Sequence, residues 1–543
     1  MTSLTGTWRL VRLALRRDRV LLPVWVLAIS GVTAAVVNAY RTTVGEAEDR
    51  IATATFGAAN PMTRIFDGPA SGTDLGAMVM VEAYQVLAIL TALMCAQAIV
   101  RHTRQDEETG RAELLGSAVV GRHARLTAAL VVTLSAAALL GGAVAAVLEA
   151  NDLGRGGSLA AGMSVAGIGW VFAGIAAVSA QVFSTARGAN AVAGAALGAA
   201  FLLRAVGDLF GTVADSGVQL ISSWPSWLSP IGWGQQVRPY FSDNWWIAGL
   251  FVAFMLALVA VAFALEAHRD VGPGMVAPAS GPAHAGAGLR SSIGLAWRLQ
   301  RTIVISWLLG AIVMGAAFGS IGESAEDVFA ENEQLTAVLQ RLSPGAGVIE
   351  LYFTFVMAFV GIAAAGYTVQ ALLRMRAEEV SGRLEPVLAT AVGRRRWMAG
   401  HVGMTAAATT VILLAAGLAG GLTYGSMTGR WAFGAGNMLA AAAVQVPAVL
   451  ALGGFVLAVF GLVPRLAGSV AWAALAAALV MGQLGAVLDL PQWVLDISPF
   501  THVPLVPAEP FTATPVAWLT VVALALGGLG FAAFRRRDLA IGA

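Results

Sequence analysis

Apolar runs long enough to cross a lipid bilayer alternate with short polar segments along most of the chain. A membrane-spanning helix needs about 20 mostly apolar residues, and twelve stretches qualify. Those in the first half are Leu21–Tyr40, Ala77–Val100, Leu126–Leu148, Ser158–Phe183, Ala189–Phe210 and Trp246–Glu266. Those in the second half are Thr302–Phe318, Ile349–Leu373, His401–Tyr424, Asn437–Leu462, Leu466–Leu488 and Pro515–Phe534. The pattern predicts an all-α integral membrane protein with twelve transmembrane helices, six in each half.

Composition supports a membrane protein and narrows its chemistry. Hydrophobic residues make up 58% of the chain and charged residues 12%, which is too apolar for an ordinary soluble surface. Cys95 is the single cysteine, so disulfides and cysteine-ligated metal sites are excluded. The spans contain no His/Glu metal pattern and no nucleophile beside a base. We therefore expect no catalytic residue and no metal site, with membrane lipids and no nucleic acid as partners.

A charged cassette occurs twice between the apolar runs, at Arg104–Arg122 and Arg376–Arg394. Aligned without a gap, the copies share Arg104/Arg376, Glu107/Glu379, Gly110/Gly382, Arg111/Arg383, Glu113/Glu385, Val120/Val392, Gly121/Gly393 and Arg122/Arg394. These charges could simply solvate a loop on the positive side of the membrane. Acidic residues contribute little to topology, however, and the acidic positions recur as well. We therefore predict that the cassettes dock a partner through paired charges.

Other segments also recur and predict two related halves. Leu13, Ala14, Arg16, Arg19, Trp25 and Leu27 match Leu295, Ala296, Arg298, Arg301, Trp307 and Leu309 at a constant spacing. Each copy is typical of an amphipathic helix that lies at the membrane interface and leads into a span. We predict pseudosymmetric halves at 1–270 and 293–543, related by an axis along the membrane normal. The Gly/Pro/Ala-rich segment 271–292 is predicted to be a flexible cytoplasmic linker.

The distribution of basic residues sets the expected orientation. All 33 of the Lys and Arg residues are arginines, and most fall on one side if the N-terminus is inside the cell. The positive-inside rule then places both termini and both cassettes in the cytoplasm. A phosphate-binding loop needs a lysine, so ATP hydrolysis, if it drives this protein, belongs to another chain. We expect a multi-pass protein of the plasma membrane.

Each half has one segment rich in Trp and Pro between its fifth and sixth spans. These segments are too apolar for exposed loops and too broken for spans, which suggests short interfacial or re-entrant helices. A static aromatic belt is the simpler alternative. The residues predicted to form an outer lid are Trp224, Trp227, Pro230, Trp233, Trp493 and Pro499.

Together these features resemble the permeases of type-two ATP-binding-cassette (ABC) exporters. The run Trp227–Trp233 and the Glu-x-x-Gly-Arg cassettes are similar to actinobacterial exporters of polyketide antibiotics and other drugs. The resemblance implies that each cassette is a coupling helix seated in a cleft of a separate ATPase subunit, two copies of which bind this chain. ATP and Mg would be bound by those subunits and no cofactor by this chain. Pro386 departs from the first copy, which has Leu114.

The resemblance also implies export of hydrophobic or amphipathic compounds by alternating access, along an axis between the halves. Polar residues on the second, fifth, eighth and eleventh spans are the candidates for this substrate path: Tyr84, Gln97, Arg204, Asp208, Tyr367, Gln370 and Gln483. Arg204 and Asp208 are four residues apart and could instead form a structural ion pair within their span.

Two other classes of function stay open. A proton-coupled multidrug antiporter of the major facilitator type also has two six-span halves, and Arg204 and Asp208 could carry its protons. The interfacial helices and the Trp/Pro segments are not required by that fold. A membrane-embedded enzyme is the third class, for which the spans supply no catalytic pattern.

Overall fold

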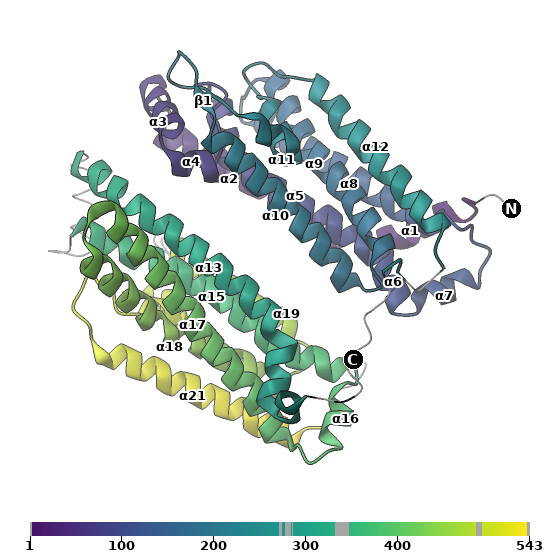
Figure 1. The fold of residues 1–543 in the computed structure, drawn as a ribbon, viewed down its shortest axis with the longest axis vertical. Coiled ribbons are helices and arrows are strands. Elements are labelled where there is room, and N and C mark those ends of the chain that lie inside the picture. Colours follow the sequence, from purple (N-terminus) through teal and green to yellow (C-terminus); the bar gives the residue numbers. More distant parts are fainter. Residues whose placement is uncertain are drawn as a thin grey trace. The chain divides into compact units, whose positions relative to one another are not determined.

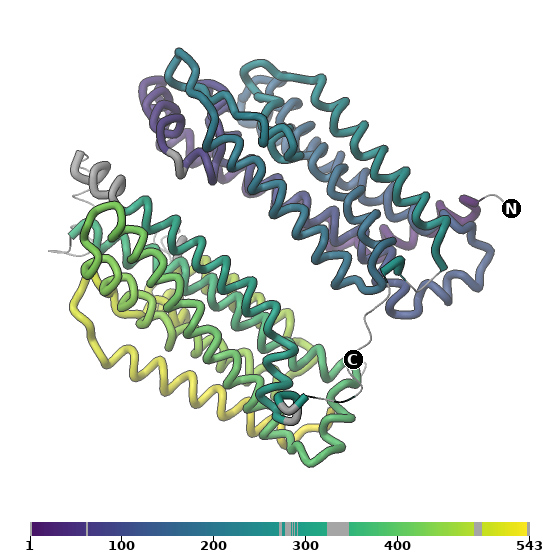
Figure 2. The backbone as a smooth tube through the Cα atoms, viewed as in Figure 1, coloured from purple at the N-terminus to yellow at the C-terminus, as the bar shows by residue number. Residues whose placement is uncertain are grey.

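The chain is built almost entirely of helices, eleven of which are long and apolar enough to cross a membrane. The computed structural model describes residues 3–270, 274–276, 284, 286–331, 347–484 and 491–539. The chain divides into two compact units, Met1–Gly281 and Pro282–Ala543. Each unit is a bundle of long helices that run roughly side by side (Figures 1 and 2). The protein is therefore an all-α, multi-pass membrane protein.

The first unit contains six of these long helices and several short elements. Its helices are α1 (Thr7–Arg17), α2 (Leu21–Thr43), α3 (Ala47–Ala59), α4 (Pro61–Phe66), α5 (Leu75–His102), α6 (Arg104–Glu108), α7 (Arg111–Gly116), α8 (Ala124–Ala150), α9 (Arg155–Val182), α10 (Ala186–Leu209), α11 (Pro230–Gln236) and α12 (Trp246–Ala267). A 3-10 helix, η1, spans Trp224–Leu228. The strands β1 (Thr212–Val213) and β2 (Leu220–Ile221) pair antiparallel, Thr212 opposite Ile221.

The second unit has five long helices in its described residues. Its elements are η2 (Ala287–Arg290), α13 (Ser292–Glu331), α15 (Val348–Val380), α16 (Leu384–Leu388), α17 (Arg394–Thr428), α18 (Trp431–Leu462), α19 (Ala467–Leu479), η3 (Val480–Leu484), α20 (Gln492–Leu495), η4 (Pro499–His502) and α21 (Ala513–Arg536). The element η3 is a π-helix, and η2 and η4 are 3-10 helices.

Eleven of the twelve predicted spans lie within long helices, and none of these extends more than one residue beyond its helix. Several of the helices are longer than the predicted spans, α13 and α17 above all. The other, Leu466–Leu488, begins as the short apolar helix α19 and continues into η3. Its last residues, 485–488, lie outside the described part of the chain. The apolar pattern therefore located the spans reliably where it was long and continuous.

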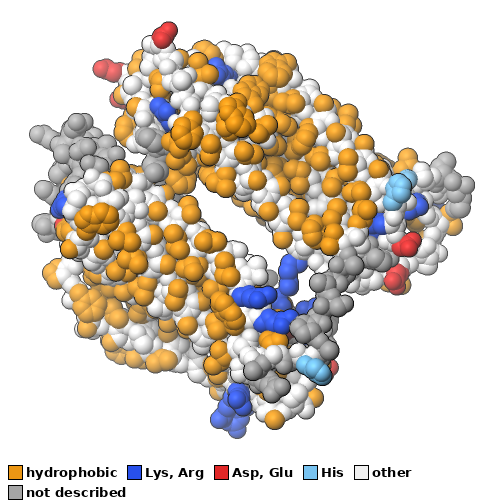
Figure 3. Space-filling view, viewed as in Figure 1, with side chains coloured by type: hydrophobic (Ala, Val, Ile, Leu, Met, Phe, Trp, Pro, Cys, Tyr) orange, Lys and Arg blue, Asp and Glu red, His pale blue; other side chains and the backbone are white. Residues whose placement is uncertain are grey.

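Burial separates central from peripheral helices in the same way in both units. The helices α5 and α9 are the most enclosed of the first unit, as are α15 and α18 of the second. By contrast, α2, α12, α13 and α21 bury little of their surface within their own unit. Apolar side chains cover much of the visible surface of the bundles (Figure 3). Such surfaces suit a lipid solvent, in which helices satisfy their own backbone hydrogen bonds.

The predicted interfacial helix is separated from the following membrane span in the first unit only. There α1 ends at Arg17 and α2 begins at Leu21. In the second unit the matching residues belong to one continuous 40-residue helix, α13, so the expectation of a second separate helix is wrong. The difference has a local cause. Pro23 lacks a backbone N–H and favours a helix start, whereas its counterpart is Ile305, which permits the helix to continue.

The predicted linker 271–292 lies partly outside the described residues, and the boundary between the units falls within it. Its described part begins close to the first unit. The backbone N–H of Val276 donates to the carbonyl of Val182 at 3.0 Å, which ties residues 274–276 to the end of α9. The predicted flexibility of the linker stays a prediction.

Glycines let α8 and α9 pack with their backbones in contact. A Cβ atom on Gly141 would collide with the carbonyl oxygen of Gly162, and one on Gly162 would collide with that of Gly141. The next residue, Gly142, has no atom within 4 Å of the Cβ position. Small residues at such contacts are the usual means of helix association in membranes, where apolar burial gives little driving force.

We predict that Gly141→Val destabilises the helical bundle of the first unit and that Gly142→Val does not. Both changes have the same effect on helix propensity, so the difference reports the α8–α9 contact alone. Overpacking of this kind costs about 1–3 kcal/mol. The loss of stability is measured as a lower midpoint of thermal unfolding in detergent, followed by size-exclusion chromatography. Equal midpoints for the two variants would show that the contact contributes no stability.

Candidate functional site

The first cassette forms two short helices, α6 and α7, and a buried cluster of ion pairs binds it to the rest of its unit. Glu107 of α6 accepts two hydrogen bonds from Arg269, at 2.8 and 2.9 Å, and pairs with Arg104 at 2.9 Å. Arg125 lies 3.5 Å from the same carboxylate. Arg104 also donates to the carbonyl of Ala180 at the end of α9. We name Arg104, Glu107 and Arg269 the first clamp, because they join the ends of α5, α9 and α12.

The second cassette has the same cluster. Glu379 at the end of α15 pairs with Arg376 at 3.2 Å and accepts a hydrogen bond from Arg537 at 2.9 Å. The guanidinium of Arg537 also lies over the rings of Phe460 and Phe534. Arg376, Glu379 and Arg537 form the second clamp. The side chain of the central glutamate is 3% exposed in the first clamp and 0% in the second, so both carboxylates bind inside the unit.

The last arginine of each cassette caps the final long helix of its unit. Arg122 donates to the carbonyls of Glu266 and Ala267 at 3.0 and 2.7 Å. Arg394 donates to the carbonyls of Phe534 and Arg537. A cation at this position satisfies unpaired carbonyls and opposes the negative end of the helix dipole. These arginines therefore attach the returning chain to α12 and α21.

The middle of each cassette faces outward. Gly110 and Gly382 adopt the left-handed conformation, with φ of 73° and 70°, which a residue with a side chain rarely adopts. The chain turns there, and the following arginine side chains are 60% (Arg111) and 63% (Arg383) exposed. The two docking faces are Gly110, Arg111, Glu113 and Leu114 in the first unit and Gly382, Arg383, Glu385 and Pro386 in the second. Pro386 lies in the first turn of α16, where its missing N–H is tolerated.

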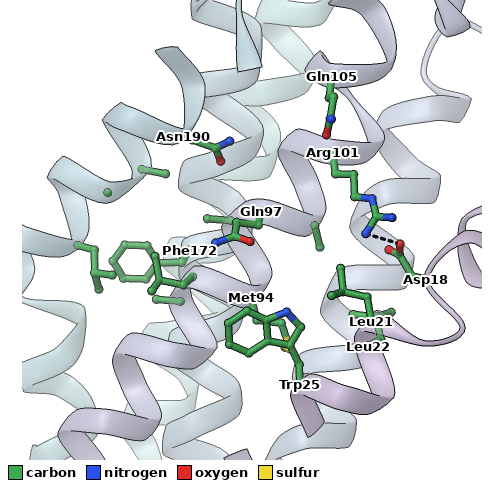
Figure 4. Close-up of a pocket in the computed structure, with 17 residues that line it drawn as sticks. Asp18, Leu21, Leu22, Trp25, Met94, Gln97, Arg101, Gln105, Phe172 and Asn190 are labelled. Atoms are coloured by element: carbon green, nitrogen blue, oxygen red, sulfur yellow. Dashed lines mark ion pairs between the residues drawn. The ribbon is translucent and has the colours of Figure 1, made fainter. Parts of the chain in front are cut away.

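A cavity of about 360 Å³ opens in the first unit between α2, α5, α9 and α10. Gln97 of α5 points into it, between Trp25 of α2 and Phe172 of α9 (Figure 4). Asn190 of α10 lines the same cavity. A mainly apolar cavity with a few polar groups is the usual form of a site for small molecules. We name it the Gln97 cavity.

The other polar candidates on the spans differ in accessibility. Gln370 is exposed and accepts a hydrogen bond from the indole of Trp307 at 2.9 Å. Tyr367 is buried against the same indole. Tyr84 is also buried, and its hydroxyl donates to the carbonyl of Ile231 in α11. The side chain of Gln483 lies outside the described residues.

Comparisons with known proteins identify the family. The chain is 39% identical to the multidrug efflux system permease protein Rv1217c of Mycobacterium tuberculosis, over 99% of this chain and 96% of that protein. Residues 289–535 also match the family described as "Multidrug efflux system permease Rv1217c, C-terminal domain". The chain belongs to this family of multidrug efflux permeases.

In this permease, Arg204 holds the short helix α4 and pairs with Asp208, and neither side chain is exposed. Both side chains are 0% exposed and lie 3.3 Å apart. Arg204 also donates to the carbonyls of Arg64 and Ile65, near the end of α4. Its guanidinium lies 4.9 Å from the ring centroid of Phe201. The geometry favours the structural alternative over a position on the substrate path.

The predicted lid residues of the permease separate into two groups. Trp224 and Trp493 are 72% and 70% exposed, as expected for residues at a membrane interface. Trp227 is partly exposed and stacks on Trp246. Trp233 is instead buried in the core, where its ring contacts Phe251 and Phe254 of α12. Pro230 and Pro499 begin α11 and η4, each after a serine cap.

Several residues of the permease site were not among the site residues predicted from the sequence. Arg269 and Arg537 complete the clamps, and Trp25 and Trp307 lie beside Gln97 and Gln370. Each pair recurs in the two halves of the sequence, so the repeat was a signal for them. Asn190 had no such signal, because it reaches the Gln97 cavity from α10 only through the tertiary fold.

We predict that Glu107→Gln and Glu379→Gln destabilise the permease, whereas Glu113→Gln leaves its stability unchanged. Removing one partner of a buried ion cluster leaves uncompensated arginines and costs on the order of 3–5 kcal/mol. An exposed glutamate contributes much less. Unfolding midpoints in detergent compare the three variants. A clamp variant as stable as the wild type would contradict the structural role assigned to these carboxylates.

Proposed function

We propose that this chain is the transmembrane subunit of an ATP-driven exporter of the type-two ABC class. It moves hydrophobic or amphipathic compounds, such as drugs and antibiotics, out of the cell by alternating access. Two copies of a separate ATPase subunit bind ATP and Mg and dock on the cytoplasmic side. The chain itself hydrolyses no ATP. Both termini are cytoplasmic, and twelve spans form two pseudosymmetric halves in the plasma membrane.

The observation that carries this proposal is the combination of an exposed docking face with a buried clamp in each unit. Arg111, Glu113, Arg383 and Glu385 are exposed and can meet charges on a partner. The two arginines make only long ion pairs within the chain, to Asp106 at 3.8 Å and to Glu378 at 4.0 Å. The clamps connect these faces to the ends of several long helices. A force applied to a docking face is therefore transmitted to a bundle rather than absorbed by a loose loop. Charge pairs at an interface also fix partner choice and register.

The alternative of a proton-coupled antiporter receives less support. Arg204 and Asp208 were the groups best suited to carry protons in the spans, but they pair with each other, and Arg204 also binds carbonyls of α4. Drug export driven by a proton gradient in vesicles without any ATPase would favour the antiporter and overturn the present proposal.

We predict that Arg111→Glu or Arg383→Glu, and Glu113→Arg or Glu385→Arg, uncouple transport while the protein remains inserted and folded. Each reversal places a charge against a like charge of the partner, at a cost on the order of 2–5 kcal/mol if that contact is buried. Recovery of the ATPase on the purified permease and stimulation of its ATP hydrolysis are the measurements.

The matched control is Arg155→Glu, because Arg155 is 78% exposed and begins α9 at the opposite end of the first unit. It should leave ATPase recovery at the wild-type level. Unchanged recovery of the ATPase and unchanged stimulation of its ATP hydrolysis in all four cassette variants would contradict the proposed coupling role.

We predict that Gln97→Trp and Gln370→Trp reduce export of large substrates more than that of small ones. A Trp side chain at Gln97 would fill part of the cavity of about 360 Å³. Leu256→Trp on α12 is the control, since Leu256 is 56% exposed and does not line that cavity. Drug accumulation in cells measures the effect across a size series. Normal export of the full series by both glutamine variants would contradict the proposed path.

A further inference from the structure

An apolar groove of about 610 Å³ lies in the first unit, between α1, α2 and α8. It adjoins the Gln97 cavity, with which it shares Asp18 and Leu22, but opens between different helices. Aliphatic and aromatic side chains supply most of its lining, including Trp8, Leu15, Leu22, Leu27, Val131 and Leu139. Its polar lining residues are Asp18, Arg19 and Ser135. The groove is therefore apolar along its length and charged at the turn between α1 and α2.

The position of α1 forms this groove. Val11 and Ala14 pack on Ala128 and Val132 of α8, while Arg17 pairs with Asp106 of α6 at 2.7 Å. The helix is thus fastened on one side, and its other side, with Trp8 and Leu15, stays 68% and 50% exposed. The break before α2 separates the two helices, and the space between them is the groove.

The charge at the mouth of the groove is positive. Asp18 is already compensated, because it pairs with Arg101 at 2.9 Å and with His102 at 2.5 Å. Burial raises the pKa of Asp18, but the hydrogen bond from His102 and the nearby arginines outweigh it and hold the pKa below its usual value. Arg19 lines the groove, while Arg12 and Arg16 are exposed on α1 outside its lining. None of the three forms an ion pair with another described residue.

We propose that this groove binds an anionic phospholipid, with an acyl chain along the apolar lining and the phosphate at Arg19, Arg12 and Arg16. An amphipathic helix with a polybasic face lies at the level of lipid headgroups, where arginines attract anionic lipids. A neutral hydrophobic drug would use the lining but leave the three guanidinium groups without anions. Under the proposed orientation, the lipid comes from the cytoplasmic leaflet. The bound lipid fills the space between α1 and α2 and joins the two helices.

Native mass spectrometry of the full-length protein in detergent tests this site. The protein is incubated with equal amounts of phosphatidylglycerol and phosphatidylcholine that carry the same acyl chains. Wild-type protein should retain phosphatidylglycerol preferentially. Ser135→Trp, or Ser135→Phe if the first variant does not fold, should lose the retained lipid by filling the groove. The triple variant Arg12→Gln/Arg16→Gln/Arg19→Gln should lose the headgroup preference, by about fivefold for each arginine.

The matched control is Arg535→Gln/Arg536→Gln, which removes exposed arginines at the end of α21 and should keep the wild-type preference. Equal retention of the two lipids by the wild type would overturn the proposal. So would wild-type retention of phosphatidylglycerol by Ser135→Trp, since the lipid would then bind elsewhere. Displacement of phosphatidylglycerol by a transported drug, with drug export lost in Ser135→Trp, would make the groove a substrate site instead.

Discussion

In each unit, a buried glutamate surrounded by arginines joins the cassette to the ends of the long helices. The position of the exposed docking face depends on this ion cluster. Glu107 and Glu379 are enclosed, yet each receives a bidentate arginine from beyond the last long helix of its unit. Such carboxylates are stable only when every charge has a partner. The clusters therefore fix where α6 and the end of α15 lie, and the glycine turns that follow present Arg111 and Arg383 outward.

Much of this arrangement could be predicted from the sequence, because the lipid bilayer restricts which residues a spanning helix can contain. A helix that crosses a bilayer must be apolar over its whole length, so continuous runs such as Trp246–Glu266 and Pro515–Phe534 located α12 and α21 with little ambiguity. The exposed middle of each cassette was also predictable, since Gly110 and Gly382 interrupt charged segments at matching positions. Arg269 and Arg537 also stand at matching positions, each followed by an aspartate after the last span of its half, although that match does not say what they bind.

Other features could not be predicted because the repeat does not report burial. Arg104 and Arg111 looked equivalent as members of one charged cassette, yet the first is enclosed and the second exposed. Trp233 was grouped with Trp224, but the turn at Ser229 directs α11 into the core. The continuous helix α13 follows from one substitution, Ile305 in place of a proline. In each case tertiary packing decided between residues of the same chemical type.

The exclusive use of arginine has a physical consequence for this architecture. Arg104, Arg122, Arg204 and Arg537 each donate to a backbone carbonyl, and three of them also pair with a carboxylate. A guanidinium has five donors in a planar fork and is never deprotonated in proteins, whereas an ammonium has three donors on a point charge. A lysine at these sites could neutralise one carboxylate but could not bridge it to the end of a second helix with the same geometry. The arginines therefore act as joints between helix ends, which is the requirement for moving a bundle of helices as one body.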